Sequence, residues 1–281
     1  MSYDPPLQHD PIGPPVPAQR RRPAQTDAAG WARRLFAPAI AVVIGLVKFG
    51  AKLKLLLLFV TKAKFLATSL SMIASVGAYT LFWGWQFAAL FVLLMLVHEW
   101  GHALQMRREG IPTTAILFIP FLGAVIGMKE APRNAWVEAK VGLAGPVVGT
   151  LGAAAMLALG VGIDSDLLRA AAFTGFLLNL FNLLPIVPLD GGRAAAALHP
   201  GVWVVGLVGF GALLFVSPNP ILILILLFGA MEAWRRWRAR QRGEDLDYYH
   251  VEPLQRVAVG VTFLAIAVAC VLGMSVSQVD V

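Results

Sequence analysis

Hydrophobic residues are gathered into long runs that contain no lysine, arginine, aspartate or glutamate. A helix that crosses a bilayer needs about 20 consecutive, mostly apolar residues, and two of the runs are long enough to hold two such helices. The pattern therefore predicts a membrane protein that crosses the bilayer several times. The charge-free runs cover residues 65–97, 141–163, 170–189, 194–231 and 257–279.

Turn and interface signals divide these runs into seven predicted spans. Aromatic residues between positions 82 and 87 favour the water–lipid interface and separate the first span from the second. The turn Ser217-Pro218-Asn219-Pro220 separates the fifth span from the sixth. We expect the spans at about 65–83, 87–107, 135–160, 167–184, 201–216, 220–235 and 255–274.

Residues 111–128 are apolar but do not fit a helix, because they are rich in β-branched side chains and contain Pro112, Pro120, Gly123 and Gly127. Non-helical backbone at membrane depth is tolerated only where protein or a water-filled cavity covers it. We expect short strands or a re-entrant hairpin here. The predicted fold class is an all-α multi-pass membrane protein with about six to seven transmembrane helices and a small membrane-embedded β-hairpin.

The first 64 residues differ from the rest of the chain. Residues 1–30 are rich in proline and arginine and predict a disordered cytoplasmic tail. Residues 31–64 mix apolar side chains with lysines and arginines, which predicts a basic amphipathic helix on the inner membrane surface. An additional span at about 36–60 is the alternative. The divisions expected after these segments are an intramembrane core at 65–235, a cytoplasmic loop at 236–254 and an additional C-terminal transmembrane helix at 255–281.

The composition agrees with a membrane protein. Of the 281 residues, 58% are hydrophobic and only 14% are charged, against roughly 25% charged residues in a soluble domain. These values exclude a soluble enzyme, a DNA-binding module and a coiled-coil scaffold. The only cysteine is Cys270, so neither an intrachain disulfide nor a cluster of thiolate metal ligands is possible.

The net charge of +7 is explained by topology rather than by nucleic acid. With seven spans and the N-terminus inside, nearly all basic residues fall on one side of the membrane, and only Arg169 lies near the other face. A span at 36–60 would place the arginine-rich tail outside, which disfavours that alternative. We therefore expect a cell-membrane protein with a cytoplasmic N-terminus, and its alanine, proline and arginine content is compatible with a GC-rich bacterial source.

The segment His98-Glu99-Trp100-Gly101-His102 stands near the inner end of the second predicted span. Residues four apart share one face of a helix, so His98 and His102 can bind one metal ion together. Glu99 is displaced by about 100° around the helix and can take a proton from water without binding the metal. Because ionisable groups inside a span are costly and usually functional, the pattern indicates a zinc hydrolase rather than a polar helix end.

A hydrolytic zinc site needs a third protein ligand. Asp190 is the favoured candidate, because it follows the helix-breaking Pro185 and Pro188 at the depth where the second span carries its histidines. The alternative role for Asp190 is a cap for the segment that starts at Arg193. The other acidic candidates are Glu109, Glu130 and Glu232.

Two motifs of this chain together resemble those of the site-2 proteases, a family of intramembrane zinc metalloproteases. The motifs are HEWGH at 98–102 and NLLPIVPLDGG at 182–192, and they lie in the family's order on the second and fourth predicted spans. The segment 111–128 is similar to the family's membrane-embedded hairpin. Only about 25 residues separate the second and third spans, which leaves no room for a substrate-filtering PDZ domain.

The resemblance implies a cofactor, a partner and a role for each motif residue. One zinc ion per chain would be bound by His98, His102 and Asp190, with Glu99 as the catalytic base. Asn182 would contact the substrate or the oxyanion. The implied partners are a transmembrane protein substrate and membrane lipid, without nucleic acid, and the oligomeric state stays open.

Residues outside the two motifs receive structural interpretations. The segment Ala144-Gly145-Pro146 looks like the family's A-G-P motif, but Gly149 stands where a polar residue is frequent. We interpret the glycines of this span as sites of close helix packing. Asn179 is expected to hydrogen-bond between helices, with contact to the site as the alternative.

The expected activity is hydrolysis of peptide bonds in or near transmembrane segments of membrane proteins, as in regulated intramembrane proteolysis. Two alternatives stay open. A zinc transporter would place ligands at several depths along a path, whereas these acids and histidines form one cluster. A catalytically silent binding protein of the same fold would lack the glutamate or a ligand, whereas this chain has all four residues.

Overall fold

The computed structural model describes Lys48 and residues 62–216, 220–243 and 247–279. The tail expected at 1–30, nearly all of the amphipathic helix expected at 31–64, and residues 217–219 of the expected turn lie outside the described residues. The chain divides into two compact units, Met1–Leu58 and Phe59–Val281, and the second unit is described below.

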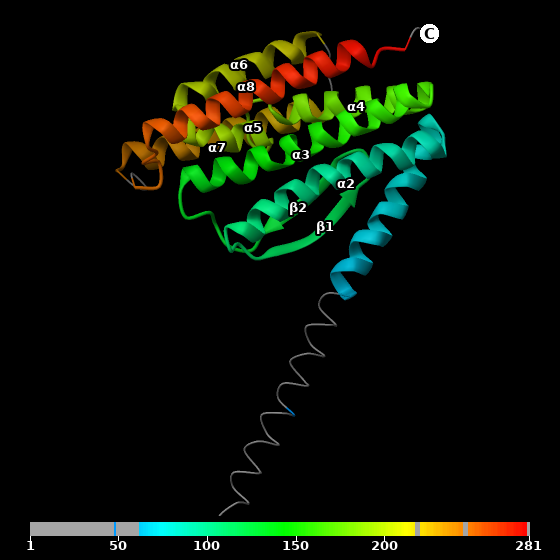
Figure 1. Cartoon of the computed structure of the whole chain (residues 1–281). Helices are drawn as coiled ribbons and strands as arrows, with labels where there is room; N and C mark the ends of the chain where they lie inside the picture. Colours follow the sequence, from blue (N-terminus) through cyan, green and yellow to red (C-terminus); the bar gives the residue numbers. More distant parts are fainter. Residues whose placement is uncertain (1–47, 49–61, 217–219, 244–246, 280–281) are drawn as a thin grey trace, which may run out of the picture. The chain divides into compact units, whose positions relative to one another are not determined.

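Helices form most of this unit (Figure 1). Each expected span corresponds to one helix, and the short α5 is an additional helix between the fourth and fifth. In chain order the helices are Lys62–Trp83, α2 (Trp85–Arg108), α3 (Ala135–Gly162), α4 (Asp166–Asn182), α5 (Asp190–Leu198), α6 (Pro200–Val216), α7 (Pro220–Gln241) and α8 (Pro253–Val276).

Four helices of the described residues are long and apolar enough to cross a membrane: Lys62–Trp83, α2, α3 and α8. α4 and α6 have 17 residues each, and α7 carries Glu232, Arg235 and Arg236 in its second half. The unit is therefore a mostly helical membrane protein with four candidate spans and a small sheet.

The hairpin expected at 111–128 is present. Its strands, β1 (Thr113–Ile119) and β2 (Gly123–Met128), pair antiparallel, with Leu117 opposite Val125. The turn between the strands contains Phe121 at φ 65°, a backbone conformation that a bulky residue rarely adopts. The apolar segment with two prolines thus forms strands rather than a helix, as its composition predicts.

One face of the helix Lys62–Trp83 covers the free edge of β1. Thr68 Oγ1 donates to the Ile116 carbonyl at 2.8 Å, and the Ser71 hydroxyl accepts from the Phe118 N–H at 3.2 Å. These bonds satisfy backbone groups that β2 does not pair, so the outer edge of β1 needs no further strand. β2 instead faces the cavity described below.

α3 is the central helix of the unit. It packs against α2, α4, α5 and α8, and Figure 1 shows it between α2 and α8. A Cβ added at Gly142 would lie 2.9 Å from the Asp190 carbonyl oxygen, and one at Gly152 would lie 2.8 Å from Val97. The close helix packing that the glycines predict is confirmed, because side chains there would force the neighbouring helices apart.

The segment after α4 folds tightly over the first turn of α5. A Cβ added at Gly191 would overlap the Leu183 carbonyl, and one at Gly192 would overlap the backbone of the same segment. The indole N–H of Trp203 on α6 donates to the Gly192 carbonyl at 2.9 Å. The two glycines therefore let the chain hold Asp190 at a defined place in the interior.

Candidate metal centre

Two helices bring the histidines and the aspartate of the motifs together. α2 carries His98 and His102 one turn apart, and Asp190 is the first residue of α5. All three side chains are buried, with exposed residue fractions of 3%, 4% and 7%. The Asp190 carboxylate faces the histidines and does not cap the helix that follows it.

Three atoms of the kind that bind zinc converge at this place. Asp190 Oδ2 lies 3.0 Å from His98 Nε2 and 3.1 Å from His102 Nε2, and the two nitrogens are 3.1 Å apart. A tetrahedral zinc ion with bonds of about 2.0 Å separates its ligand atoms by roughly 3.3 Å. The triangle of atoms therefore has the dimensions of a zinc site.

Hydrogen bonds on the far side of each ring aim these nitrogens at the triangle. His98 Nδ1 lies 2.8 Å from Asn179 Oδ1, and His102 Nδ1 lies 2.8 Å from the Val141 carbonyl oxygen. Because both partners are acceptors, each Nδ1 carries a hydrogen and each Nε2 presents a lone pair. Two lone pairs and a carboxylate oxygen that converge in this way form an acceptor set that can bind a cation. The residues present fit a divalent metal ion such as zinc.

Glu99 lies beside the triangle rather than in it. Its side chain is buried, and a carboxylate oxygen lies within 4.8 Å of a ring nitrogen of each histidine. The carboxylate also lies near the backbone N–H of Ile126 on β2. A carboxylate just outside the triangle can exchange a proton with a water molecule held there, which is the position expected of a base.

A cavity of about 630 Å³ opens onto the cluster. This volume lies within the usual range of ligand pockets, about 300–1,000 Å³. The hairpin forms one wall, and the first half of α7 forms another. The apolar part of the lining includes Phe121, Leu122, Val125, Ile221, Leu224 and Phe228.

Asn182 is brought to the wall of this cavity. It is the last residue of α4, and its side-chain amide donates to the Leu178 carbonyl one turn earlier at 3.1 Å. An amide group has two hydrogens, so one donor of Asn182 is not used by this bond. The side chain thus borders the same cavity as the triangle.

The other acidic candidates are engaged elsewhere. Glu109 pairs with Lys140, and Glu232 pairs with Arg236 at 2.8 Å. Glu130 is exposed in the loop before α3. Of the four acidic candidates for the third ligand, Asp190 is therefore the one that lies within 3.1 Å of both histidine nitrogens.

Asn179 is a residue of the site that neither motif contains. The sequence analysis gave contact between Asn179 and the metal centre as an alternative. The hydrogen bond from His98 confirms that contact. The feature of the sequence that could have indicated this role is a polar side chain within an apolar run, three residues before Asn182. A single sequence does not show which neighbour such an amide meets.

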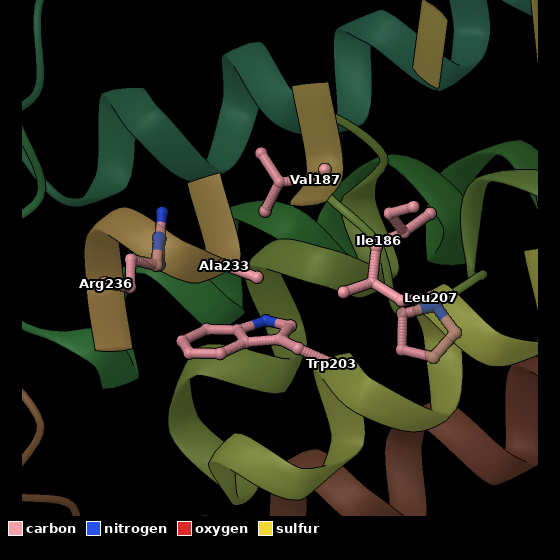
Figure 2. Close-up of a pocket in the computed structure, with 8 residues that line it drawn as sticks. Ile186, Val187, Trp203, Leu207, Ala233 and Arg236 are labelled. Atoms are coloured by element: carbon pink, nitrogen blue, oxygen red, sulfur yellow. The ribbon is translucent and has the colours of Figure 1, made fainter. Parts of the chain in front are cut away.

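A second buried polar cluster has no counterpart in the motifs. The Glu138 carboxylate accepts from Arg236 at 2.9 and 3.2 Å and from the Tyr248 hydroxyl at 2.6 Å. The Arg236 guanidinium also lies 5.3 Å from the ring of Trp203, and Figure 2 shows this indole beside Ala233 and Arg236 of α7. The cluster joins α3, α7 and the segment before α8, and through Trp203 it reaches α5.

Comparison with known proteins supports the same class of site. Residues 86–166, which contain α2, the hairpin and α3, match the family model described as Peptidase family M50. Zinc metalloprotease MJ0392 of Methanocaldococcus jannaschii is 32% identical over 124 residues. Rip3 of Mycobacterium tuberculosis, assigned by its name as a zinc metalloprotease, is 34% identical over 120 residues.

These alignments cover 42% and 39% of this chain, and 35% and 30% of the two relatives. The matched part of the chain thus spans about a third of the length of the relatives. Residues 86–166 match the model of peptidase family M50, the site-2 protease family, which confirms the resemblance indicated by the motifs.

Proposed function

We propose that this chain is an intramembrane zinc metalloprotease that hydrolyses peptide bonds in or near transmembrane segments of membrane proteins. The observation that carries the proposal is the triangle formed by His98, His102 and Asp190, with Glu99 beside it and a cavity of about 630 Å³ in front. The names of the relatives and the family of residues 86–166 support the same activity.

The mechanism follows from what each residue can do. His98, His102 and Asp190 would hold a zinc ion. As a Lewis acid, the zinc would polarise the scissile carbonyl and lower the pKa of water. Glu99 accepts a proton from the attacking water at its carboxylate and passes it to the nitrogen of the leaving amine. Asn182 donates a side-chain hydrogen to the oxygen on which negative charge develops.

The hairpin suits the binding of an extended substrate. A transmembrane segment arrives as a helix whose carbonyls are hydrogen-bonded, so it must unwind before its peptide bonds can react. The outer edge of β1 is covered by the helix Lys62–Trp83, whereas β2 lines the cavity. The unwound segment would add to the edge of β2 by backbone pairing, next to Glu99.

The membrane arrangement is part of the proposal. We propose six to seven spans, a cytoplasmic N-terminus and a place in the cell membrane of a bacterium, with membrane lipid and a transmembrane protein as partners. The proposed divisions are a tail at 1–30, an interfacial helix at 31–64, the protease core at 65–235, a loop at 236–254 and an additional helix at 255–281. The distribution of basic residues supports this orientation.

The two alternatives fit the described residues less well. A zinc transporter needs ligands at successive depths, whereas these histidines and acids lie around one point. A silent binding protein needs no base, whereas Glu99 is buried beside the histidines, where a carboxylate without a function would be costly.

The zinc content of the detergent-purified protein tests the proposal. We expect about one zinc per chain in the wild type and in Glu99→Gln, and a loss of zinc in Asp190→Ala, because a tetrahedral site needs its third protein ligand. Glu232→Ala is the matched control, since its carboxylate pairs with arginines, and it should keep its zinc.

Each other outcome points to a different reading. Zinc retained in Asp190→Ala and lost in Glu232→Ala would move the third ligand to Glu232. A wild type without zinc would favour the silent binding protein. With zinc present, Glu99→Gln serves as the inactive control in a search for the cleaved membrane protein.

A further inference from the structure

We propose that Asn179 positions His98 for the metal by determining which ring nitrogen carries the hydrogen. This inference rests on the proposed function, because it concerns the same metal centre. Asn179 lies on α4, is only 2% exposed and places Oδ1 2.8 Å from His98 Nδ1. It does not bind the metal in this proposal and acts only through the histidine.

The orientation of the Asn179 amide follows from its second hydrogen bond. Nδ2 lies 2.7 Å from the carbonyl oxygen of Gly175, which can only accept. The amide nitrogen must therefore face Gly175, and the amide oxygen must face His98. Turning the amide over would set two acceptors against each other at Gly175, so the neighbouring backbone fixes the side chain.

This orientation controls the chemistry of His98. Since Oδ1 accepts, the hydrogen stays on Nδ1, and Nε2 keeps a lone pair for the metal. Without that acceptor, the hydrogen would move to Nε2, where Asp190 Oδ2 lies only 3.0 Å away and can accept it. Two of the three metal ligands would then satisfy each other, and the metal would have to break that bond in order to bind.

A glycine on α3 makes room for the amide. A Cβ added at Gly149 would overlap Asn179 Oδ1. Any side chain at position 149 would therefore push the amide away from His98. Gly149 and Asn179 thus form one unit, in which the missing side chain on α3 allows the amide of α4 to reach the ring.

Zinc affinity measured by competition with a chelator tests this unit. Asn179→Leu keeps much of the volume but has no acceptor, and Gly149→Ala keeps the amide but displaces it. We expect both variants to bind zinc about 10–100-fold more weakly than the wild type, the usual effect of losing the partner of a metal-binding histidine. Asn179→Asp retains an acceptor toward His98 Nδ1 but sets a second acceptor against the Gly175 carbonyl, so it should bind zinc more tightly than Asn179→Leu and more weakly than the wild type.

Matched controls separate positioning from a loss of structure. Thr174→Val removes a side-chain bond elsewhere on α4, and Gly162→Ala adds a methyl group on α3 where nothing lies within 4 Å. Both should bind zinc like the wild type. The metal-free Asn179→Leu and Thr174→Val variants should have similar unfolding temperatures, because a positioning residue affects metal binding more than folding.

Two results would overturn the inference. One is a zinc affinity of Asn179→Leu equal to that of the wild type. The other is a zinc affinity of Asn179→Asp as low as that of Asn179→Leu, which would show that the acceptor oxygen has no effect on metal binding. A wild type that binds no zinc would overturn the proposed function together with this inference. A wild type that binds zinc beside an Asn179→Leu variant of equal affinity would overturn this inference alone.

Discussion

At the scale of single residues, the metal centre depends on glycines as much as on its polar side chains. The ring of His102 lies directly against α3 at Gly145, where an added Cβ would overlap Nε2, the atom that faces Asp190. The A-G-P segment therefore contributes to the site through the absence of a side chain. Its glycine is a structural requirement of the histidine geometry and takes no part in proton transfer.

The role of Gly145 leads to a prediction. Gly145→Ala should displace the His102 ring and remove the bound zinc, because the methyl group needs the space of the ligand nitrogen. Gly162→Ala on the same helix meets nothing within 4 Å and should leave the zinc content unchanged. Metal analysis of the purified proteins measures both, and a Gly145→Ala variant with full zinc content would contradict the argument.

At the scale of elements, a buried ion pair ties α7 to α3. Glu138 on α3 is bound by Arg236 of α7 and by the hydroxyl of Tyr248. The first half of α7 forms a wall of the cavity, so the same helix is held at one end by this ion pair and borders the cavity at the other. The position of that wall therefore depends on polar contacts outside the metal centre.

Tyr248→Phe tests this clamp. Burial and the neighbouring Glu138 carboxylate raise the pKa of Tyr248 above its ordinary value of about 10. The phenol thus stays protonated and donates to Glu138 at neutral pH. We expect the substitution to lower the free energy of unfolding by about 1.5–3 kcal/mol at pH 7, the usual contribution of a hydrogen bond to a charged group. Denaturation in detergent measures the change.

The pH dependence of the same variant gives a second readout. Because the folded-state pKa of Tyr248 is raised, its stabilising contribution is complete below about pH 10 and is lost as the pH rises through that raised value. The difference in stability between the wild type and Tyr248→Phe should therefore shrink at strongly alkaline pH. A difference that grows with pH would contradict the assignment of the phenol as the donor.

At the scale of the whole molecule, the proposed topology places the two ends of α3 on opposite sides of the membrane. α3 has 28 residues and is one of the four candidate spans. The loop before it lies among basic residues, whereas Asp164 lies in the loop after it and Asp166 begins α4. The positive-inside rule assigns the first loop to the cytoplasm and the second to the outside.

Labelling of single cysteines tests this orientation. The native Cys270 is fully buried, so a reagent that does not cross membranes should react only at introduced sites. We expect Asp166→Cys to be labelled from outside in intact cells, and Glu130→Cys to be labelled only after the membrane is opened. The reverse pattern would show that the topology is opposite to the proposed one. Labelling of both cysteines from the same side would show that α3 does not cross the membrane.

The sequence by itself predicted the elements of this protein well. Charge-free runs and prolines depend on local physics, namely the cost of charge in lipid and of proline in a helix. The span expected at 135–160 is therefore found as Ala135–Gly162, and the segment 111–128 is found as a hairpin. The pairing of His98 with His102 was equally accessible, since residues four apart always share a helix face.

Only the tertiary structure decided which distant residues meet. Asp190 lies 92 positions after His98, and Glu138 lies 98 positions before Arg236, so no helical period relates them. The contact of Asp190 with the histidines comes from the packing of α3 against α2 and α5, which glycines make close, and the contact of Glu138 with Arg236 joins α3 to α7. For the same reason, the bond of Asn179 to His98 could be stated only after α4 was placed beside α2. Periodicity specifies a face of a helix, and packing specifies what that face touches.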